Sequence, residues 1–170
     1  ELDSDLYRNQ YTTQIDHYDN YSTLFDNLNR ICILLIDFNI DIWYYISLNY
    51  FSQKIVDEEV GSSTMPHKIN PINFENAEGN FNVANALLGF MSQRLPVSRL
   101  QRDLTDSTVL RNMGTAFAHT ILSMKNVLDG LDRVTLDKEV VTADLKRHPV
   151  IIAEAIQSVL RSERYEDAYE

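Results

Sequence analysis

The feature that most constrains the fold is the stretch from Asp16 to about Val56, which contains neither glycine nor proline. Within it, apolar residues recur at heptad-like spacing, the pattern of an amphipathic helix that packs along partner helices. We therefore predict one helix of about 40 residues, which at 1.5 Å per residue would be roughly 60 Å long. The apolar stripe consists of Tyr21, Leu24, Leu28, Ile31, Leu35, Phe38, Ile42 and Tyr45.

The run from Ile31 to Ile36 is apolar on every side of such a helix. A turn without a polar face is expected to be buried all round, either in a large bundle or at an interface between subunits. Cys32 lies in this run and is the single cysteine of the chain, so no disulfide can form within it. We expect a reduced core thiol, which fits a cytoplasmic protein.

Helix breakers are scarce elsewhere too. Five glycines and four prolines among 170 residues favour long helices, so the predicted fold class is all-α. Gly79 and Gly89 lie inside the second predicted helix and suggest close contacts between helices. The further helices are expected from Pro71 or Asn73 to about Arg94, from Asp106 to about Leu128 with Asp106 or Thr105 as N-cap, from Lys138 to Lys146 and from Val150 to Arg161.

Charge and hydropathy exclude several partners. A net charge of −10 disfavours nucleic acid or an anionic membrane as a partner of the whole chain. No apolar run approaches the roughly 20 residues that a bilayer requires, and no signal peptide is visible. The chain opens on the polar "ELDSDLYRNQ" and stops in "ERYEDAYE", which reads like the start of another helix. We therefore expect a fragment, or a protein with parts missing.

The loop "GSSTMPHKINPINFENAEGN", residues 61 to 80, gathers hydroxyl, imidazole, ammonium and amide groups between two predicted helices. A serine is a weak base at its ordinary pKa, but a nearby cation such as Lys68 stabilises alkoxide character. A loop that carries both groups can close over an active site. Taken by itself, however, a loop of this composition is more often a solvated connection between helices.

The same loop resembles the signature of the fumarase/aspartase superfamily of lyases. That pattern reads G-S-S, two residues, P, one residue, K, one residue, N-P, three residues, E, and residues 61–75 fill every fixed position. The resemblance implies an anti β-elimination that releases fumarate, with Ser62 as the base that removes the Cβ proton. It also implies that Lys68 and Asn70 bind the substrate carboxylate, where charge accumulates.

The resemblance assigns lesser parts to four other residues of this loop. Met65 would contribute its backbone N–H, Ser63 would contact substrate, and Glu75 would orient the groups that do. His67 would either contact substrate or be partly exposed without a catalytic part. Should Ser63 rather than Ser62 be the base, the assignment of the two serines would be reversed.

The stretch "LPVSRLQRDLTDSTVLRN", residues 95 to 112, places Arg102, Ser107 and Arg111 five and four residues apart across a predicted helix start. Two guanidinium groups and a hydroxyl can hold one phosphate, and a helix N-terminus favours an anion. The competing interpretation is a pair of solvated arginines that pair with Asp103 and Asp106, and for this stretch alone it is the more common case.

This stretch also resembles the phosphate-binding segment of the adenylosuccinate lyase family, in particular its bacterial-type branch. Upstream, "YTTQIDHYD" resembles the same branch, and Gln14 matches a substrate-binding glutamine there, with Thr12 or Thr13 lining the same pocket. This resemblance extends over most of residues 11 to 170. Fumarase and aspartase act on substrates without a phosphate and have no need of the arginine pair.

This family resemblance implies a reaction, an assembly and a domain division. Its members cleave adenylosuccinate to AMP and fumarate, and the succinylated aminoimidazole carboxamide ribotide in purine synthesis, with no metal and no organic cofactor. They are homotetramers whose active sites are shared between subunits. Residues 1–95 would be part of the central long-helix bundle, and residues 96–170 would carry the phosphate-binding segment and a smaller helical C-terminal domain.

The sequence departs from the family in one respect that bears on catalysis. The family's general-acid histidine comes from a segment upstream of anything present here, and His17 does not match its motif. For His17, His119 and His148 we expect structural roles. Two other hypotheses stay open: another fumarate-releasing lyase, of the argininosuccinate lyase, fumarase or aspartase type, and a helical nucleotide-binding or assembly module without catalysis.

Overall fold

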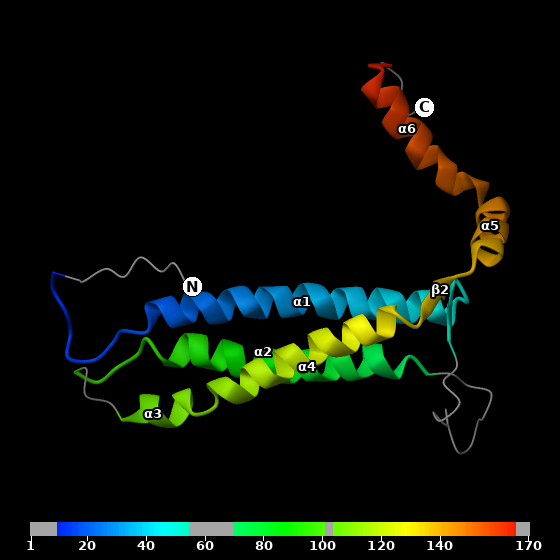
Figure 1. The fold of residues 1–170 in the computed structure, drawn as a ribbon. Helices are drawn as coiled ribbons and strands as arrows, with labels where there is room; N and C mark the ends of the chain where they lie inside the picture. Colours follow the sequence, from blue (N-terminus) through cyan, green and yellow to red (C-terminus); the bar gives the residue numbers. More distant parts are fainter. Residues whose placement is uncertain (1–9, 55–69, 101–103, 166–170) are drawn as a thin grey trace, which may run out of the picture. The chain divides into compact units, whose positions relative to one another are not determined.

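The computed structural model describes residues 10–54, 70–100 and 104–165 (Figure 1). Most of this part is helical, so the predicted all-α class is confirmed, although a small antiparallel sheet was not foreseen. The elements are α1 (Asp19–Ser47), β1 (Phe51–Gln53), α2 (Ile72–Arg94), α3 (Thr105–Leu110), α4 (Met113–Leu131), β2 (Val134–Leu136), α5 (Lys138–Arg147), the 3-10 helix η1 (Pro149–Ile151) and α6 (Ile152–Ser162).

The chain divides into two compact units. The first comprises the described residues of Glu1–Asp41 and Ile72–Gly130, and the second those of Ile42–Pro71 and Leu131–Glu170. The sequence-based division near residue 95 stays a prediction.

In the first unit α1, α2 and α4 lie side by side (Figure 1). The Ser22 hydroxyl, near the start of α1, donates a 2.8 Å hydrogen bond to the carbonyl oxygen of Ser92, near the end of α2. At the other end of α2, a β-carbon added to Gly130 of α4 would lie 2.8 Å from Cζ of Phe74. Helix α2 therefore runs antiparallel to both α1 and α4.

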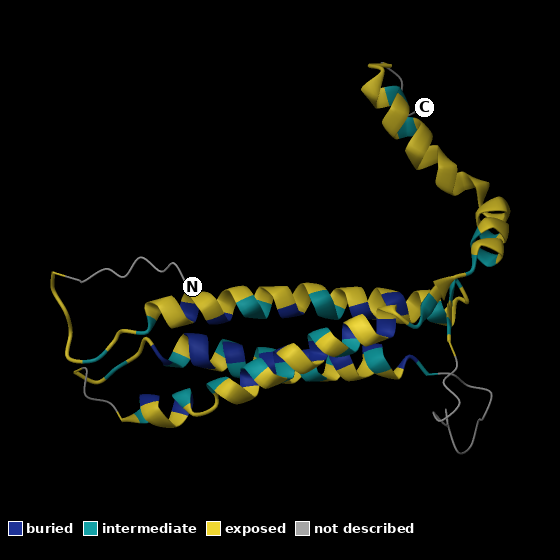
Figure 2. Cartoon of the chain, in the orientation of Figure 1, coloured by how far each residue is buried: buried dark blue, intermediate teal, exposed yellow. Residues whose placement is uncertain are grey.

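The core lies between these three helices, where the buried positions in Figure 2 gather. Its largest fully buried apolar side chains are Phe25, Phe74, Phe81, Leu88, Met91 and Leu95. On α1 the buried positions Phe25, Cys32 and Asn39 recur every seven residues. Cys32 is a free, buried thiol, as predicted.

The stripe predicted on α1 lies mostly outside this core. Leu28 and Leu35 pack against the core, but Tyr21, Leu24 and Phe38 are among its exposed members. The expectation that the turn at Ile31–Ile36 is buried all round is wrong for the single chain, since the exposed fraction of Leu34 is 70%. Helix α1 carries apolar side chains on two faces, and one chain covers only one of them.

The first helix is also shorter than predicted. It ends at Ser47, because Asn49 adopts a left-handed conformation with φ of 60° and the N–H of Tyr50 bonds to the carbonyl oxygen of Tyr45. Asparagine tolerates this conformation better than most residues, so it can end a helix without glycine or proline. The chain then enters β1.

The helix predicted from Asp106 to Leu128 is in fact two helices, α3 and α4. The break falls at Arg111 and Asn112, where the Asn112 side-chain amide donates to the carbonyl oxygen of Thr108. Neither predicted residue is the cap of α3. Its N-cap is Leu104, without a side-chain cap bond, and Asp106 lies in the first turn. By contrast, the predicted bounds of α2 are confirmed within one or two residues.

The two glycines expected at close helix contacts are not at such contacts. An added β-carbon at Gly79 would meet nothing within 4 Å, and at Gly89 it would make only an ordinary contact with Asn29 at 3.9 Å. Gly130 is the position where a side chain cannot fit, because the ring of Phe74 occupies the space.

The second unit contains the small sheet and hydrogen bonds that join Tyr50 to α5 and its cap. Strands β1 and β2 pair antiparallel, with Phe51 opposite Leu136. The hydroxyl of Tyr50 donates to the carboxylate of Asp144, which raises the pKa of this tyrosine. Asp137 caps α5 by accepting from the N–H groups of two residues in its first turn, and α5 and α6 lie close to their predicted positions. No helix in the described ranges is long and apolar enough to cross a membrane.

Candidate functional site

The predicted site residues divide between described and undescribed parts of the chain. Gln14, Asn70, Glu75, Ser107 and Arg111 are described. Those that lie outside the described residues are Ser62, Ser63, Met65, His67, Lys68 and Arg102.

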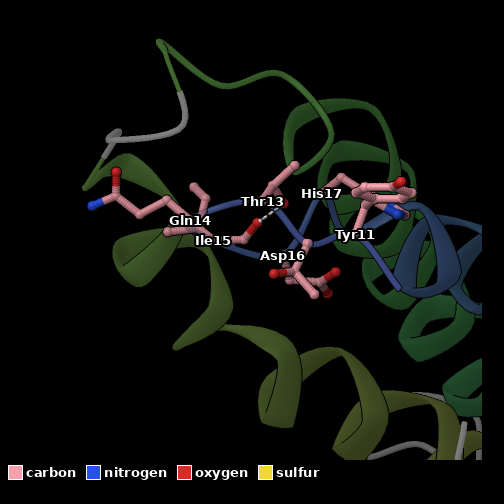
Figure 3. A pocket seen from close by; sticks show the side chains of 7 residues that line it. Tyr11, Thr13, Gln14, Ile15, Asp16 and His17 are labelled. Atoms are coloured by element: carbon pink, nitrogen blue, oxygen red, sulfur yellow. Dashed lines mark hydrogen bonds between the residues drawn. The ribbon is translucent and has the colours of Figure 1, made fainter. Parts of the chain in front are cut away.

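The segment that precedes α1 forms a pocket of about 380 Å³ lined by residues 11–17 (Figure 3). The Thr13 hydroxyl donates to the carbonyl oxygen of Ile15, and Nδ1 of His17 accepts from the N–H of Asp19 at 3.1 Å. His17 thus stabilises the first turn of α1, in keeping with its expected structural role. Gln14 is exposed, and its side chain points away from that of Tyr11.

Ser107 and Arg111 are both exposed and lie four residues apart, at a spacing that puts two residues on one side of a helix. The Ser107 hydroxyl donates a 2.8 Å bond to the carbonyl oxygen of Leu104, and Arg111 is the C-cap of α3. The hydroxyl can turn from this local bond to donate to an anion. The competing pairing of Arg111 with Asp106 is not present, since neither carboxylate oxygen of Asp106 has a hydrogen-bond partner among the described residues.

Tyr18 and Asp106 belong to two segments at one end of the first unit. Tyr18 follows Gln14 by four residues, and Asp106 directly precedes Ser107. Burial raises the pKa of the Tyr18 phenol, and the charge of Asp106 raises it further. The segment before α1 and helix α3 lie at the same end of the first unit (Figure 1). The sequence missed this relationship, because nothing in the spacing of Tyr18 and Asp106 indicates that the two segments lie at one end.

The described part of the signature is Asn70 and Glu75, which lie at the end of α2 that is farther from Ser92. Glu75 is exposed in the first turn of α2, and Asn70 lies two residues before that helix begins. Ser92, seventeen residues after Glu75, is bonded to Ser22. At a rise of 1.5 Å per residue, Glu75 is about 26 Å from Ser92 along the helix. One chain therefore does not bring Glu75 together with Gln14, Ser107 and Arg111.

Metal ligands do not cluster in the described part of the chain, which contains no group of three or more His, Cys, Asp or Glu residues that could hold an ion. The described candidates are two amides, a carboxylate, a hydroxyl and a guanidinium, and all of these except the carboxylate can donate a hydrogen bond. Such donors bind an anionic, polar organic ligand through hydrogen bonds.

Helices α1, α2 and α4 form a bundle of long helices, and residues 61–75 of the sequence carry every fixed position of the fumarase/aspartase lyase signature. A family model described as "Lyase" matches residues 3–84, and one described as "Adenylosuccinate lyase C-terminal" matches residues 98–170. With these two matches and the relatives below, the chain belongs to the adenylosuccinate lyase family.

Three curated adenylosuccinate lyases illustrate the similarity. That of Dictyostelium discoideum is 54% identical over 169 residues, which are 99% of this chain and 36% of that protein. That of Buchnera aphidicola subsp. Schizaphis graminum is 50% identical over 97% of this chain and 36% of its own length. That of Escherichia coli (strain K12) is 46% identical over 95% of this chain and 36% of its own length. The chain thus spans about 36% of the length of these relatives.

Proposed function

We propose that this chain is part of an enzyme that cleaves adenylosuccinate to AMP and fumarate, and that acts likewise on the succinylated aminoimidazole carboxamide ribotide. The observation that carries the proposal is the complete signature at residues 61–75. It occurs in a chain that is about half identical to curated adenylosuccinate lyases over nearly all of its length.

In the proposed reaction Ser62 removes the proton from Cβ of the succinyl group. The electron pair forms the new carbon–carbon double bond as the bond from Cα to nitrogen breaks, and the leaving nitrogen takes up a proton from a general acid. Negative charge accumulates on the adjacent carboxylate, where Lys68, Asn70 and the N–H of Met65 stabilise it. Glu75 keeps this loop's donors oriented.

The nucleotide end of the substrate is held at the other set of residues. Arg102 and Arg111 bind the phosphate together with Ser107, and Gln14 contacts the substrate from the segment before α1. The exposure of Ser107 and Arg111 and the absence of a bond between Arg111 and Asp106 support this assignment. They also favour a phosphorylated substrate over those of fumarase or aspartase.

The active enzyme is proposed to be a cytoplasmic homotetramer whose sites are shared between subunits. Two observations support this arrangement. Asn70 and Glu75 are separated from Gln14, Ser107 and Arg111 by most of the length of α2. A second chain therefore has to supply one of these two sets of residues. Helix α1 also exposes an apolar face, on which Leu24, Ile33 and Leu34 lie, and burial of such a face stabilises association.

The test is fumarate release from adenylosuccinate by the purified full-length protein, followed by absorbance, with Ser62→Ala as the inactive control. Release that depends on Ser62 supports the proposal. Release of fumarate from argininosuccinate but not from adenylosuccinate would assign another lyase of the class. AMP binding without turnover of either compound would favour the non-catalytic module.

A further inference from the structure

Helices α2 and α4 lie side by side (Figure 1), and a chain of side-chain hydrogen bonds joins them near the start of α2. Nδ1 of His119, on α4, lies 2.7 Å from Oδ1 of Asn80, on α2. Nδ2 of Asn80 donates to the carbonyl oxygen of Asn76 at 2.8 Å and to Oδ1 of Asn76 at 2.9 Å. The histidine on α4 is therefore linked, through one amide, to the side chain of the residue that follows Glu75.

The backbone decides how these groups are oriented. A main-chain carbonyl oxygen can only accept, so the atom of Asn80 that faces the carbonyl group of Asn76 is the amide nitrogen. Oδ1 of Asn80 then faces His119. Because this oxygen can only accept, Nδ1 of His119 carries a proton and donates the hydrogen bond. One tautomer of the neutral imidazole, with its proton on Nδ1, fits this chain of bonds.

The same reasoning fixes the amide of Asn76. Its Oδ1 accepts from Asn80, so its Nδ2 points away from Asn80 and presents two N–H donors. Asn76 is exposed, whereas His119 and Asn80 are half-buried. Held in this way, the residue after Glu75 offers its donors rather than its oxygen to a ligand. Carboxylate oxygens are the acceptors that bind such donors most strongly.

We propose that His119 and Asn80 are positioning residues, which hold the Asn76 amide with its N–H donors toward a carboxylate of the succinyl group. This inference rests on the proposed function, because it assumes that the signature end of α2 receives the succinyl part of the substrate. Neither His119 nor Asn80 touches that substrate. Both act through Asn76, which directly follows Glu75 and lies six residues after Asn70.

Packing of the two helices does not require this bridge. Phe74 is buried and its ring lies against Gly130 of α4, so an apolar contact already holds the start of α2. An apolar contact has no direction, whereas hydrogen bonds fix the orientation of the groups that they join. Without the bridge the Asn76 amide is free to turn, and substrate binding has to order it. Ordering one such side chain weakens binding by roughly two- to tenfold.

The experiment uses the full-length protein and three measurements: the inhibition constant of fumarate, the Kd for AMP by calorimetric titration, and the melting temperature. Fumarate carries two carboxylates and AMP carries none, so a change in the Asn76 amide should affect fumarate alone. Asn80→Asp is the decisive variant. Its carboxylate still accepts from His119 but cannot donate to Asn76, whose amide then turns its nitrogen toward residue 80 and its oxygen toward the substrate.

Asn80→Asp is expected to raise the inhibition constant of fumarate by at least about tenfold, the effect of one lost hydrogen bond to a charged group. The Kd for AMP and the melting temperature should change little. Asn80→Ala frees the Asn76 amide and should raise the inhibition constant by about two- to tenfold. Asn82→Asp is the matched control, because Asn82 is exposed on the same helix and also donates to the carbonyl oxygen four residues before it. It adds the same charge and should leave inhibition by fumarate unchanged.

Three variants test the proton on Nδ1 of His119. His119→Asn places an amide donor where Nδ1 lies, whereas His119→Gln places one where Nε2 lies, and His119→Phe retains a ring without a donor. Inhibition by fumarate is expected to weaken in His119→Phe by about two- to tenfold, because the Asn80 amide loses its partner. It should recover in His119→Asn but not in His119→Gln.

Several results would overturn the inference. They are unchanged inhibition by fumarate in Asn80→Asp, an equal loss in Asn82→Asp, a loss of AMP binding as large as that of fumarate binding, and recovery in His119→Gln but not in His119→Asn. A lower melting temperature with unchanged binding of both ligands would also overturn it, because the bridge would then only stabilise the fold. Failure of the proposed function is recognised separately, since the unaltered protein would then neither release fumarate from adenylosuccinate nor bind AMP.

Discussion

The 2.8 Å hydrogen bond from the Ser22 hydroxyl to the carbonyl oxygen of Ser92 fixes which end of α2 lies beside the Gln14 segment. The signature precedes the opposite end of α2, beyond Glu75. Asn70 and Glu75, the described part of the signature, are therefore held apart from Gln14 by the length of α2.

This separation predicts complementation between two defective proteins. Ser62→Ala and Arg111→Ala affect residues that two different subunits contribute to one proposed site. When the two variants are mixed under conditions that exchange subunits, some sites receive an intact residue of each kind. A fraction of the activity should return, measured as fumarate release at a substrate concentration well below KM. A mixture no more active than its components would mean that each chain builds its own site.

Ser62→Ala tests the base. Because a methyl group cannot accept the Cβ proton, kcat should fall by several orders of magnitude, while the Kd for AMP stays within about twofold. The two quantities are measured by fumarate release and by calorimetric titration. Ser63→Ala is the control for the loop itself. If Ser63→Ala abolished turnover and Ser62→Ala did not, the two serines would have to exchange roles.

Arg111→Ala tests the phosphate contact. Loss of one guanidinium from a phosphate site should weaken AMP binding by about ten- to a hundredfold. This is the change in affinity expected when one charge-assisted hydrogen bond is lost. Arg111→Lys retains the charge but not the paired donors and should lie between. Adenosine, which lacks the phosphate, supplies the control, and its affinity should be the same in all three proteins. Equal losses for AMP and adenosine would assign Arg111 a structural role instead.

The sequence predicted secondary structure best where the signals lie in neighbouring residues. The bounds of α2, α5 and α6 follow from helix periodicity and breakers, and Asp137 supplies a standard cap. The prediction of helix ends failed where an asparagine, and not a glycine or proline, ended the helix. Asn49 ends α1 and Asn112 separates α3 from α4, but asparagines also lie inside α1 and α2, so neither stop was readable from residue type.

The candidate site shows a second limit of the sequence. The spacing of Arg102, Ser107 and Arg111 predicted a phosphate site from neighbours in the chain, and the structure leaves Ser107 and Arg111 exposed. The segment before α1 and helix α3 are far apart in sequence but lie at one end of the first unit, which depends on how the helices pack. On α1 the predicted apolar stripe included Tyr21, but packing buries Phe25 and leaves Tyr21 exposed.

Gly130→Ala should destabilise the first unit. The new methyl group would lie 2.8 Å from Cζ of Phe74, in a space that the ring already fills, so overpacking should cost about 1–3 kcal/mol. Gly79→Ala is the matched control in a neighbouring helix, where nothing lies within 4 Å and alanine favours the helix by up to about 1 kcal/mol. The melting temperature should fall for Gly130→Ala and stay or rise for Gly79→Ala. A rise for both would mean that the Phe74 ring moves aside freely.

Cys32 should be unreactive in the folded protein. Burial raises the pKa of this thiol, and its contact with the Thr120 hydroxyl at 3.9 Å lowers it by less. The folded state thus binds the proton more tightly than the unfolded state, so this stabilising contribution is fully present below the ordinary thiol pKa. It is lost as the pH rises through the folded value. A thiol-specific reagent at pH 8 should label Cys32 only at the rate of unfolding, and at full stoichiometry in urea. Rapid labelling without urea, at a rate independent of stability, would show that α1 and α4 separate locally around Cys32.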